Sequence, residues 1–499
     1  MAQTLSGALG WWARMRGDQP AIIFAGDTLS YHQWWLWANR IAVHLHAQGV
    51  QPGDRVAVCA TNSLAYCALI MGVIRAGAIV APINFRYTAR EIAELCEGVE
   101  PALCFAGADQ MAAMAAAGYP AQPMAMLDGL RDAGDAAATH DDDADAPVVI
   151  IATSGSTARP KGVVYTNRSV TAYAASWATE DVVVGPGSRV ITLAPLNTSA
   201  GFVQLAHYMV QGCTLYMEPQ FDALRALRLI EEQRINAFGA VPAFFEFIAA
   251  LPEFADADLS SLTLVTAGGA RVSPALLETY RAKGVIIRQI YGQTEIGGNV
   301  TMMPAHLALS APHQCGWGGV FMDVRVVRPD GADCAPDEPG EIIMRSPGMM
   351  QGYWRNPQET AKAIRDGWLY SGDIGSLDGD GLLTFVDRMK DIIISGGLNI
   401  SAAEVERVLC EFAGVNEALV IAAPDEKFGE TPFAVLHGPA PVDVAAVVAH
   451  CNANLSNYKV PRYIVWSAQP LPRLATGKLS KPAIRAQYAG AHATMARVR

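Results

Sequence analysis

The sequence lacks the features typical of membrane-spanning, disulfide-rich and zinc-binding proteins. Its longest apolar stretches, near residues 67–74 and 244–251, are interrupted by Arg75 and Glu246, and neither reaches the ~18 residues that a membrane-spanning helix needs. The nine cysteines are scattered, with no C-x-x-C pair. This pattern favours reduced thiols and disfavours a disulfide framework or a zinc site.

A signal peptide and a basic surface are also missing. Residues 1–20 have neither the basic start nor the apolar core of a secretory signal, so we expect a cytoplasmic protein. The 37 basic and 48 acidic side chains give a net charge of −11, and without a basic cluster nucleic acid is not an expected partner. An acidic protein of this kind must gather positive charge locally if it binds a polyphosphate.

Chain length and the order of the expected elements indicate two domains. A chain of 499 residues, 51% of them hydrophobic, is too long for a single core and has ample apolar surface to bury. Between residues 31 and 291, helices and strands are expected to alternate, which favours a layered α/β domain with a parallel or mixed sheet. From Asp323, short strands and Asp-Gly turns predict a small β subdomain.

The expected elements follow from apolar periodicity and from turn residues. In the first domain, helices are expected at 31–48, 63–76, 88–96, 201–211, 223–233 and 274–283, and strands at 55–60, 78–82, 102–105, 189–193, 214–217, 237–241, 262–267 and 285–291. Residues 107–147, rich in Ala, Gly and Asp, are interpreted as a variable surface segment, and the run THDDDADAP as a solvated turn rather than a metal site.

A second, α+β domain of about a hundred residues, a normal domain size, is expected from Lys390 onward. Its expected strands are 391–395, 418–422, 433–437 and 463–466, and its expected helices are 402–410 and 442–455. We therefore predict an N-terminal domain over residues 1–389 and a C-terminal domain over residues 390–499.

The segment VVIIATSGSTARPKGVVYT, residues 148–166, has the composition of a phosphate-binding loop between two strands. Gly155 lets the backbone approach an anion closely, and Lys161 supplies a mobile positive charge. Four hydroxyls can donate to phosphate oxygens, and they belong to Thr153, Ser154, Ser156 and Thr157. The plain alternative is a hydrophilic hairpin loop. The segment is not a Walker loop, because Pro160 follows Gly155 where that pattern has Gly.

The string TSGSTARPKG resembles the phosphate loop of the adenylate-forming superfamily, which includes acyl-CoA synthetases, luciferases and the adenylation domains of peptide synthetases. The usual form has Gly where this chain has Ala158, and this change removes no donor that a phosphate needs. With four further segments in the family's order, the resemblance covers nearly the whole chain. It implies an acid–thiol ligase of the AMP-forming acyl-CoA synthetase type, with a large α/β/α N-terminal domain and a small mobile C-terminal lid.

Two of these segments follow expected strands. Tyr291-Gly292-Gln293-Thr294-Glu295 offers an aromatic face for a purine, a hydroxyl for a phosphate and a carboxylate for Mg²⁺, although a loop with a helix cap is the plain alternative. It resembles the family's Y-G-x-T-E segment. Gly268, Gly269 and Ala270 leave room for a flat ligand, and a tight strand-to-helix turn explains them equally well.

The remaining segments are in the last quarter of the chain. Asp373 suits a ribose diol and Arg388 could reach the same hydroxyls, although a surface salt bridge is the plain alternative. The resemblance implies that these two residues bind ribose and that Lys390 is the hinge of the C-terminal domain. It also implies that Lys478 is the catalytic lysine, which stabilises charge on the α-phosphate and the acid. Gly396 and Gly397 are expected beside the CoA arm, unless they form only a tight turn.

The acid pocket is the least defined part of the predicted site. The family often has P-x-F-H before a helix, whereas this chain has Asn197 and Thr198 at the last two positions. No Asp that would bind an α-ammonium group occurs there, which favours a plain carboxylic acid, aromatic or of medium chain length. Candidate pocket residues, several of which could equally be core, are Thr198, Phe202, His207, Val241, Phe244, Phe245, Ile290, Gly292 and Gly297.

The resemblance implies a two-step reaction with ATP, Mg²⁺ and CoA. The acid would form an acyl-adenylate, with Glu295 as metal ligand and Thr294 and Lys478 as catalytic groups, and CoA would then take the acyl group. One alternative is an enzyme that loads a separate carrier protein, and another is a non-enzymatic nucleotide-binding regulator, which the intact Lys478, Glu295 and Asp373 disfavour. The sequence is also compatible with a homodimer.

Overall fold

The structure is a computed structural model that describes residues 3–134, 143–153, 161–396, 398–474 and 478–498. By its internal contacts the chain forms two compact units. Unit 1 contains Met1–Val324 and Met344–Tyr370, and unit 2 contains Arg325–Ile343 and Ser371–Arg499. The chain passes between the units three times, in strands β16, β17 and β20.

Unit 1 contains a seven-stranded mixed sheet in the order β18-β8-β7-β4-β3-β5-β6. Parallel pairing joins β7, β4, β3, β5 and β6, whereas β7–β8 and β8–β18 are antiparallel. The strands are β3 (Arg55–Cys59), β4 (Ile79–Ile83), β5 (Leu103–Ala106), β6 (Gln122–Pro123), β7 (Pro147–Thr153), β8 (Lys161–Thr166) and β18 (Gly352–Tyr353). The near-continuous β-branched residues of β3, β4 and β7 suit strands covered on both faces.

A nine-stranded sheet, in the order β15-β14-β13-β12-β11-β9-β10-β1-β2, forms the rest of the framework of unit 1. Its six central strands, from β13 to β1, are parallel, and antiparallel strands lie at both edges. The strands are β1 (Pro20–Phe24), β2 (Asp27–Ser30), β9 (Arg189–Thr192), β10 (Thr214–Met217), β11 (Ala237–Ala240), β12 (Leu264–Gly268), β13 (Ile287–Gln293), β14 (Gly298–Met302) and β15 (Trp317–Gly318).

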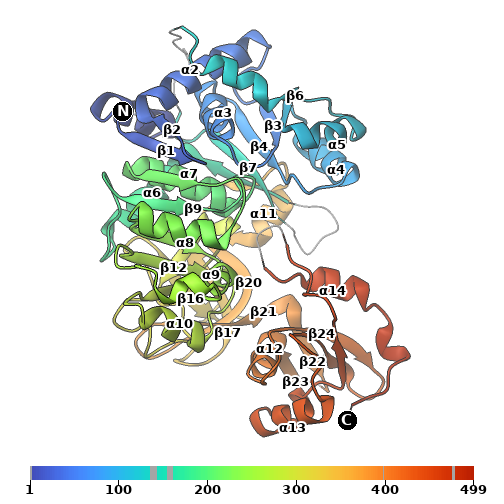
Figure 1. Ribbon diagram of the computed structural model, residues 1–499. Coiled ribbons are helices and arrows are strands. Elements are labelled where there is room, and N and C mark those ends of the chain that lie inside the picture. Colours follow the sequence, from blue (N-terminus) through green and yellow to red (C-terminus); the bar gives the residue numbers. More distant parts are fainter. Residues whose placement is uncertain (1–2, 135–142, 154–160, 397, 475–477, 499) are drawn as a thin grey trace. The chain divides into compact units, whose positions relative to one another are not determined.

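Helices cover these sheets, and their ends follow from capping residues. Ser30, Thr88 and Thr166 form capping boxes at the beginnings of α2, α4 and α6, which satisfy otherwise unpaired N–H groups. Helices α8, α9 and α10 lie beside β12 (Figure 1), and their apolar side chains form one buried cluster with those of β11 and β12. The helices of unit 1 are α1 (Leu5–Met15), α2 (Tyr31–Ala47), α3 (Leu64–Arg75), α4 (Ala89–Val99), α5 (Met111–Ala116), α6 (Asn167–Ser176), α7 (Ser199–Gln211), α8 (Ala223–Glu232), α9 (Pro242–Ala249), α10 (Pro274–Arg281) and α11 (Pro357–Ala363).

A small β sheet contains the three strands in which the chain passes from one unit to the other. It has the order β16-β17-β20-β19, with β21 paired to β20. Its strands are β16 (Asp323–Val327), β17 (Gly340–Arg345), β19 (Ile364–Arg365), β20 (Trp368–Leu377) and β21 (Leu383–Arg388). The short strands expected after Asp323 are therefore present.

The C-terminal part of unit 2 is an α+β layer with apolar side chains on both faces of its sheet. In β24, Ala418 and Val420 face one apolar cluster, whereas Leu419 and Ile421 face another, as the two-residue period of a strand requires. Helices α12 and α13 contribute to the first cluster and α14 to the second. The elements are β22 (Ile392–Ser395), β23 (Leu398–Ser401), α12 (Ala402–Cys410), β24 (Glu417–Asp425), β25 (Gly429–His437), α13 (Val444–Asn454), β26 (Tyr463–Trp466) and α14 (Lys481–Gln487).

The structure confirms the expected α/β class and refines individual elements. The described part of residues 107–147 contains two 3-10 helices, α5 and β6, all between Ala108 and Leu130. Residues 389–391 form a 3-10 turn before β22 instead of the start of a strand. The domain boundary at residue 389 stays a prediction.

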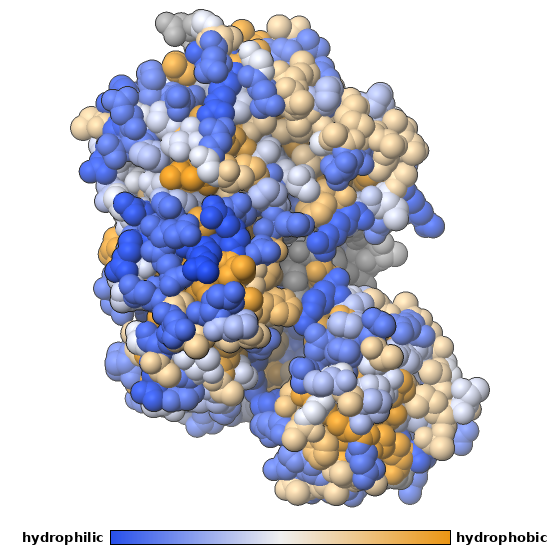
Figure 2. Space-filling model, in the orientation of Figure 1, coloured by the Kyte–Doolittle hydropathy of each residue, from blue (hydrophilic) through white to orange (hydrophobic). Residues whose placement is uncertain are grey.

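The visible face combines hydrophilic and apolar side chains (Figure 2). Large apolar side chains are exposed singly or in short runs, as at Val320 and Phe321. Among the described residues, helices that combine the length and the apolar character needed to cross a bilayer are absent.

The first prediction concerns the C-terminal core. Leu436 is fully buried in the cluster beneath α12 and α13, so Leu436→Ala leaves a cavity and should cost about 2–5 kcal/mol of unfolding free energy. Leu398→Ala, at a half-exposed strand position of the same sheet, is the control and should cost far less. Urea unfolding measures both, and equal losses would contradict the assigned core.

Candidate functional site

The predicted site residues of unit 1 follow the carboxyl ends of neighbouring strands. In the order β13-β12-β11-β9, the segments that come next begin at Thr294, Gly269, Val241 and Leu193. Ligands in open α/β sheets bind beyond the carboxyl ends of the strands. The topology therefore brings the predicted nucleotide and acid segments to one edge of the nine-stranded sheet.

The predicted phosphate loop closes the β7–β8 hairpin. Thr153 and Lys161 are the register partners at the loop end of the hairpin. The Thr153 hydroxyl donates to the Lys161 carbonyl over 3.3 Å. Ser154, Gly155, Ser156 and Thr157 lie outside the described residues. The hairpin thus places Lys161 where the loop rejoins the sheet.

Lys161 has one neighbour in β18 and another in α11. Its Nζ lies 2.5 Å from Oε2 of Glu359 and 4.8 Å from the ring centre of Tyr353. Hydrogen bonds from Lys161 and then Lys362 lower the pKa of Glu359 to about 2. Glu359 is therefore a carboxylate at any working pH, and the ion pair is intact.

Glu295 lies in a short 3-10 turn, Thr294–Ile296, directly after β13. The Tyr353 hydroxyl donates to Oε1 of Glu295 over 3.0 Å, and the Tyr165 hydroxyl donates to the Thr294 carbonyl over 2.5 Å. Burial, and then the charge of Glu295, raise the pKa of Tyr353, so this tyrosine remains a hydrogen-bond donor. The turn is thus fixed by tyrosines of two strands in the other sheet, β8 and β18.

Two glycines of this segment are required by close backbone approach. A Cβ on Gly292 would lie 2.0 Å from the Gly298 carbonyl oxygen, and one on Gly297, where φ is +90°, would lie 2.1 Å from the Gly348 carbonyl oxygen. No side chain fits at either position without moving the backbone. These glycines therefore have a structural reason in addition to their predicted place in the acid pocket.

The β12 turn is similarly close-packed. A Cβ on Gly268 would lie 2.5 Å from the Ile290 side chain, and Gly269 has a φ of +81°. Ala270 follows as an exposed residue. The two glycines therefore have a structural reason at the end of β12, where the chain leaves the sheet.

The candidate acid-pocket residues have mixed roles. Thr198 is the N-cap of α7, since its hydroxyl oxygen accepts from the Gly201 N–H over 3.2 Å. Phe202 is buried 6.5 Å from the ring of Tyr165, and Phe245 belongs to the core beside α10. Phe244 stacks on Phe221 at 3.8 Å. Only part of this predicted set is therefore available to line a pocket.

His207 lies on α7 among aromatic rings. Its ring lies 6.1 Å from Tyr173, whose hydroxyl donates to Oδ1 of Asn299 over 2.6 Å. Asn299 follows Gly297 by two residues, so α6, α7 and the segment after Glu295 meet here. Burial lowers the pKa of His207 from 6.5 to about 4, and the imidazole is neutral near pH 7.

In unit 2, strand pairing brings the predicted ribose-binding residues together. Asp373 of β20 is the register partner of Arg388 of β21, and Nε of Arg388 lies 3.6 Å from Oδ1 of Asp373. The Asp373 carboxylate is buried, whereas the arginine side chain is half exposed. This arrangement leaves a guanidinium that can turn toward a diol.

Lys478 lies close to the same pair. Burial and then the positive charge of Arg388 lower the pKa of Lys478, and Asp373 opposes this shift. Its carbonyl accepts from the Leu474 N–H over 2.7 Å, in a turn closed by the Arg473–Leu479 bridge. The structure therefore brings three predicted site residues together within unit 2.

The remaining predicted residues of unit 2 flank this group. Lys390 lies in the 3-10 turn after β21, where burial and Arg388 lower its pKa. Gly396 has a φ of +60° and donates its N–H to the Phe428 carbonyl over 2.7 Å, so its backbone is attached to the segment between β24 and β25. Gly397 lies outside the described residues.

A magnesium ion at Glu295 would need phosphate oxygens as its other ligands. Within the part of the chain that the structure describes, clusters of three or more His, Cys, Asp or Glu side chains that could hold a metal are absent. Mg²⁺ is commonly bound by one or two carboxylates together with substrate phosphates. A single oriented carboxylate therefore fits a metal that arrives with ATP.

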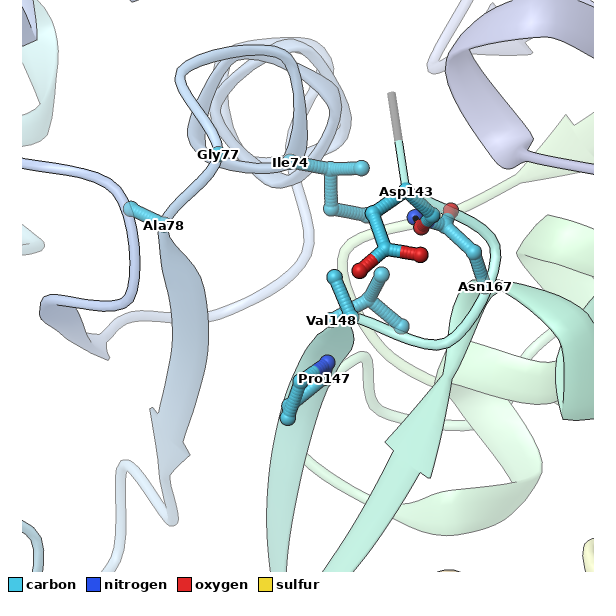
Figure 3. A pocket seen from close by; sticks show the side chains of 8 residues that line it. Ile74, Gly77, Ala78, Asp143, Pro147, Val148 and Asn167 are labelled. Carbon is cyan, nitrogen blue, oxygen red and sulfur yellow. Dashed lines mark hydrogen bonds between the residues drawn. The ribbon is translucent and has the colours of Figure 1, made fainter. Parts of the chain in front are cut away.

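Two cavities in unit 1 lie away from the predicted site residues. The first, of about 10 Å³, is at the beginning of β7, beside Pro147 and Val148, and has room for at most one water molecule (Figure 3). The second, of about 240 Å³, lies beside β1 and β10 and is lined in part by Glu218 and Arg225. Neither is a candidate for the nucleotide site.

Sequence reasoning missed Tyr165, Tyr353 and Glu359. Tyr353 and Glu359 reach Lys161 only because β18 pairs with β8, nearly two hundred residues earlier in the chain. The one local signal is the pair Asn356-Pro357, which begins α11 and so indicates an ordered segment after β18.

Comparison with known proteins yields two family matches. The model described as an AMP-binding enzyme matches residues 9–354, and the model of the AMP-binding enzyme C-terminal domain matches residues 404–478. Together they contain most of the predicted segments. The predicted residues outside both matches lie between them, at Asp373, Arg388, Lys390, Gly396 and Gly397.

The similar proteins cover nearly the full chain. A long-chain-fatty-acid CoA ligase of Mycobacterium tuberculosis is 34% identical over 497 residues, covering 96% of this chain and 98% of its own. A feruloyl-CoA synthase of Amycolatopsis is 36% identical over 513 residues, covering 96% and 99%. The o-succinylbenzoate CoA synthetase of Bacillus subtilis, solved with its acyl-adenylate, has a TM-score of 0.87 at 26% identity, covering 95% and 96%.

The second prediction concerns His207. Its folded-state pKa of about 4 lies below the unfolded value of 6.5, so between these values the unfolded chain binds more protons. Stability should therefore fall by about 2–3 kcal/mol as the pH drops from 7 to 4, and His207→Gln should remove this part of the loss. Urea unfolding across this pH range measures it, with His32→Gln at an exposed position as control. Equal losses in the wild type and in His207→Gln would contradict the assigned burial.

Proposed function

Because the chain belongs to the AMP-binding enzyme family of adenylate-forming ligases, we propose that it is an ATP-dependent carboxylic acid:CoA ligase. It activates an apolar acid as an acyl-adenylate and transfers the acyl group to CoA as a thioester. The observation that carries the proposal is the grouping of the predicted residues: Lys161 and Glu295 are linked through Tyr353, and Lys478 lies beside Asp373 and Arg388.

In the first step, a carboxylate oxygen of the acid forms a bond to the α-phosphorus of ATP, and pyrophosphate leaves. Lys161 and the hydroxyls at the end of β7 bind the phosphates. Mg²⁺, when bound at Glu295, neutralises phosphate charge and orients the chain of phosphates. Lys478 stabilises the negative charge that develops between the acid and the α-phosphate.

In the second step, the CoA thiolate attacks the acyl carbonyl carbon, and AMP leaves with the electron pair of the broken bond. We propose Lys390 as the hinge on which residues 390–499 turn between the two steps, which removes Lys478 and brings Gly396 and Gly397 to the acyl-adenylate. Asp373 and Arg388 hold the ribose during both steps.

The acid is proposed to be aromatic or of medium chain length. Apolar and aromatic residues, among them Phe202, Phe244 and the neutral His207, lie on the helices that follow β9 and β11. The described residues around Thr198 supply no charge for an ammonium group. The similar proteins carry names as different as long-chain-fatty-acid CoA ligase and feruloyl-CoA synthase, so long-chain fatty acids are assayed beside the aromatic and medium-chain acids for comparison.

The third prediction is a substrate profile. Purified protein with ATP and Mg²⁺ should release pyrophosphate with a subset of aromatic and C6–C12 fatty acids, and CoA should raise the steady-state rate by converting the trapped adenylate. Thioester formation, followed by mass spectrometry, identifies the acceptor. Pyrophosphate release that is indifferent to CoA but is stimulated by an acyl carrier protein would instead support the carrier-loading alternative. No release with any acid would contradict the ligase assignment.

The fourth prediction separates the two half-reactions. Lys478→Ala should reduce adenylation by 10²-fold or more, about the effect of removing one charge-stabilising group, and should leave thioester formation from supplied acyl-AMP within a few-fold of the wild type. Lys481→Ala, in the same region but paired with Glu406, is the control. Equal loss of both half-reactions in Lys478→Ala would argue against the rotation about Lys390.

A further inference from the structure

The carboxylate of Glu359 forms ion pairs with two lysines. Oε2 of Glu359 lies 2.5 Å from Nζ of Lys161, and Oε1 lies 2.5 Å from Nζ of Lys362. The first pair is largely enclosed, with 16% and 22% of the two side chains exposed, whereas Lys362 is 72% exposed. The pair with Lys161 is therefore the better shielded from water and salt.

The position of Glu359 is fixed by the backbone that surrounds it. The Trp354 N–H donates to the Gly162 carbonyl over 2.7 Å, directly beside Lys161. Two residues on, Asn356 caps α11 and its Oδ1 accepts from the Glu359 N–H over 3.1 Å. The Tyr353 N–H donates to the hydroxyl of Thr360 over 2.9 Å. The segment from β18 to α11 is thus hydrogen-bonded to β8, and its two ends are hydrogen-bonded to each other through Tyr353 and Thr360.

This attachment determines where the Lys161 ammonium points. A lysine side chain loses rotamer freedom when it is ordered, and here the Tyr353 ring and the Glu359 carboxylate order it in the folded protein. An ammonium group has three donors, and Glu359 uses one of them. The others remain for a second anion at the mouth of the β7–β8 hairpin.

We propose that Glu359 is a positioning residue for the adenylation step, which holds the Lys161 ammonium where the phosphates of ATP arrive. This inference rests on the proposed phosphate-binding role of Lys161. Glu359 itself contacts no reacting atom, and it acts through Lys161. The second half-reaction starts from acyl-AMP and does not involve the pyrophosphate end of ATP, so it does not depend on this pair.

The test is Glu359→Gln, which keeps the size of the side chain and removes its charge. We expect the KM for ATP in the pyrophosphate-release assay to rise about tenfold, the magnitude of one charge-assisted hydrogen bond. The KM for the acid and the rate of thioester formation from supplied acyl-AMP should change less than twofold. Glu359→Asp, which restores the charge, should recover part of the ATP affinity.

Two controls isolate the pair. Lys362→Ala removes the other cation from the same carboxylate, and Glu278→Gln removes an exposed ion pair in α10, and neither should alter the KM for ATP. In a double-mutant cycle, Glu359→Gln should have little further effect once Lys161 is Ala, because its effect passes through that residue.

The outcomes distinguish the inference from the function on which it rests. If Lys161→Ala leaves the KM for ATP unchanged, the phosphate-binding role of Lys161 is wrong and the inference falls with it. If Lys161→Ala raises the KM but Glu359→Gln does not, the function stands and the inference is overturned. If Glu359→Gln slows both half-reactions alike and lowers the melting temperature, the pair is only structural and the inference is again overturned.

Discussion

The antiparallel pairing of β8 with β7 on one side and β18 on the other is the constraint on which the site in unit 1 depends. This pairing allows no side chain at Gly162, because a Cβ there would lie 2.6 Å from Ile150 and 3.3 Å from Trp354. The close approach places the Tyr353 ring against the Lys161 ammonium group, and the Tyr353 hydroxyl donates a hydrogen bond to Glu295. Three segments far apart in the chain are thereby linked, by the backbone pairing of β18 with β8 and by the side chain of Tyr353.

A second strand pair does the same for unit 2. The register of β20 and β21 sets Asp373 against Arg388, and the next residue inward, Asp387, accepts from the Ser401 hydroxyl and the Ala403 N–H, both over 2.9 Å. The strand that carries the predicted ribose contact is therefore attached to the beginning of α12. The side chain proposed to bind a ligand, Arg388, and the side chain that fixes the backbone, Asp387, are neighbours on one strand, and the two-residue period of a strand directs them to opposite faces.

The elements that the sequence predicts well are those with local causes. The helix at 31–48 is expected from apolar spacing and Gly49, and it is observed as Tyr31–Ala47 with a Ser30 capping box. Lys161, Glu295 and Lys478 are predicted from motifs, because their chemistry is expressed in adjacent residues. The short elements between Ala108 and Leu130 are not predicted, since an Ala- and Gly-rich segment carries little periodic signal. They are positioned by long-range contacts: α5 packs on α4, β6 pairs with β5, and the 3-10 helix at Met124–Leu130 packs on α2 and α3.

The site residues that local reasoning misses depend on long-range pairing. Nothing near Tyr353 or Glu359 in the sequence indicates that β18 joins an edge of the seven-stranded sheet. A two-residue strand has no detectable alternation, and its place follows only from the fold. Thr198 shows the converse, since a residue chosen for its place in a family motif is also the cap of α7.

The two apolar clusters of the C-terminal sheet draw all their residues from positions after 390. A layer with its own complete interior does not depend on residues from the rest of the chain for its apolar packing. The free energy that stabilises this layer is therefore expected to come mainly from residues within it, as in a domain that could fold alone.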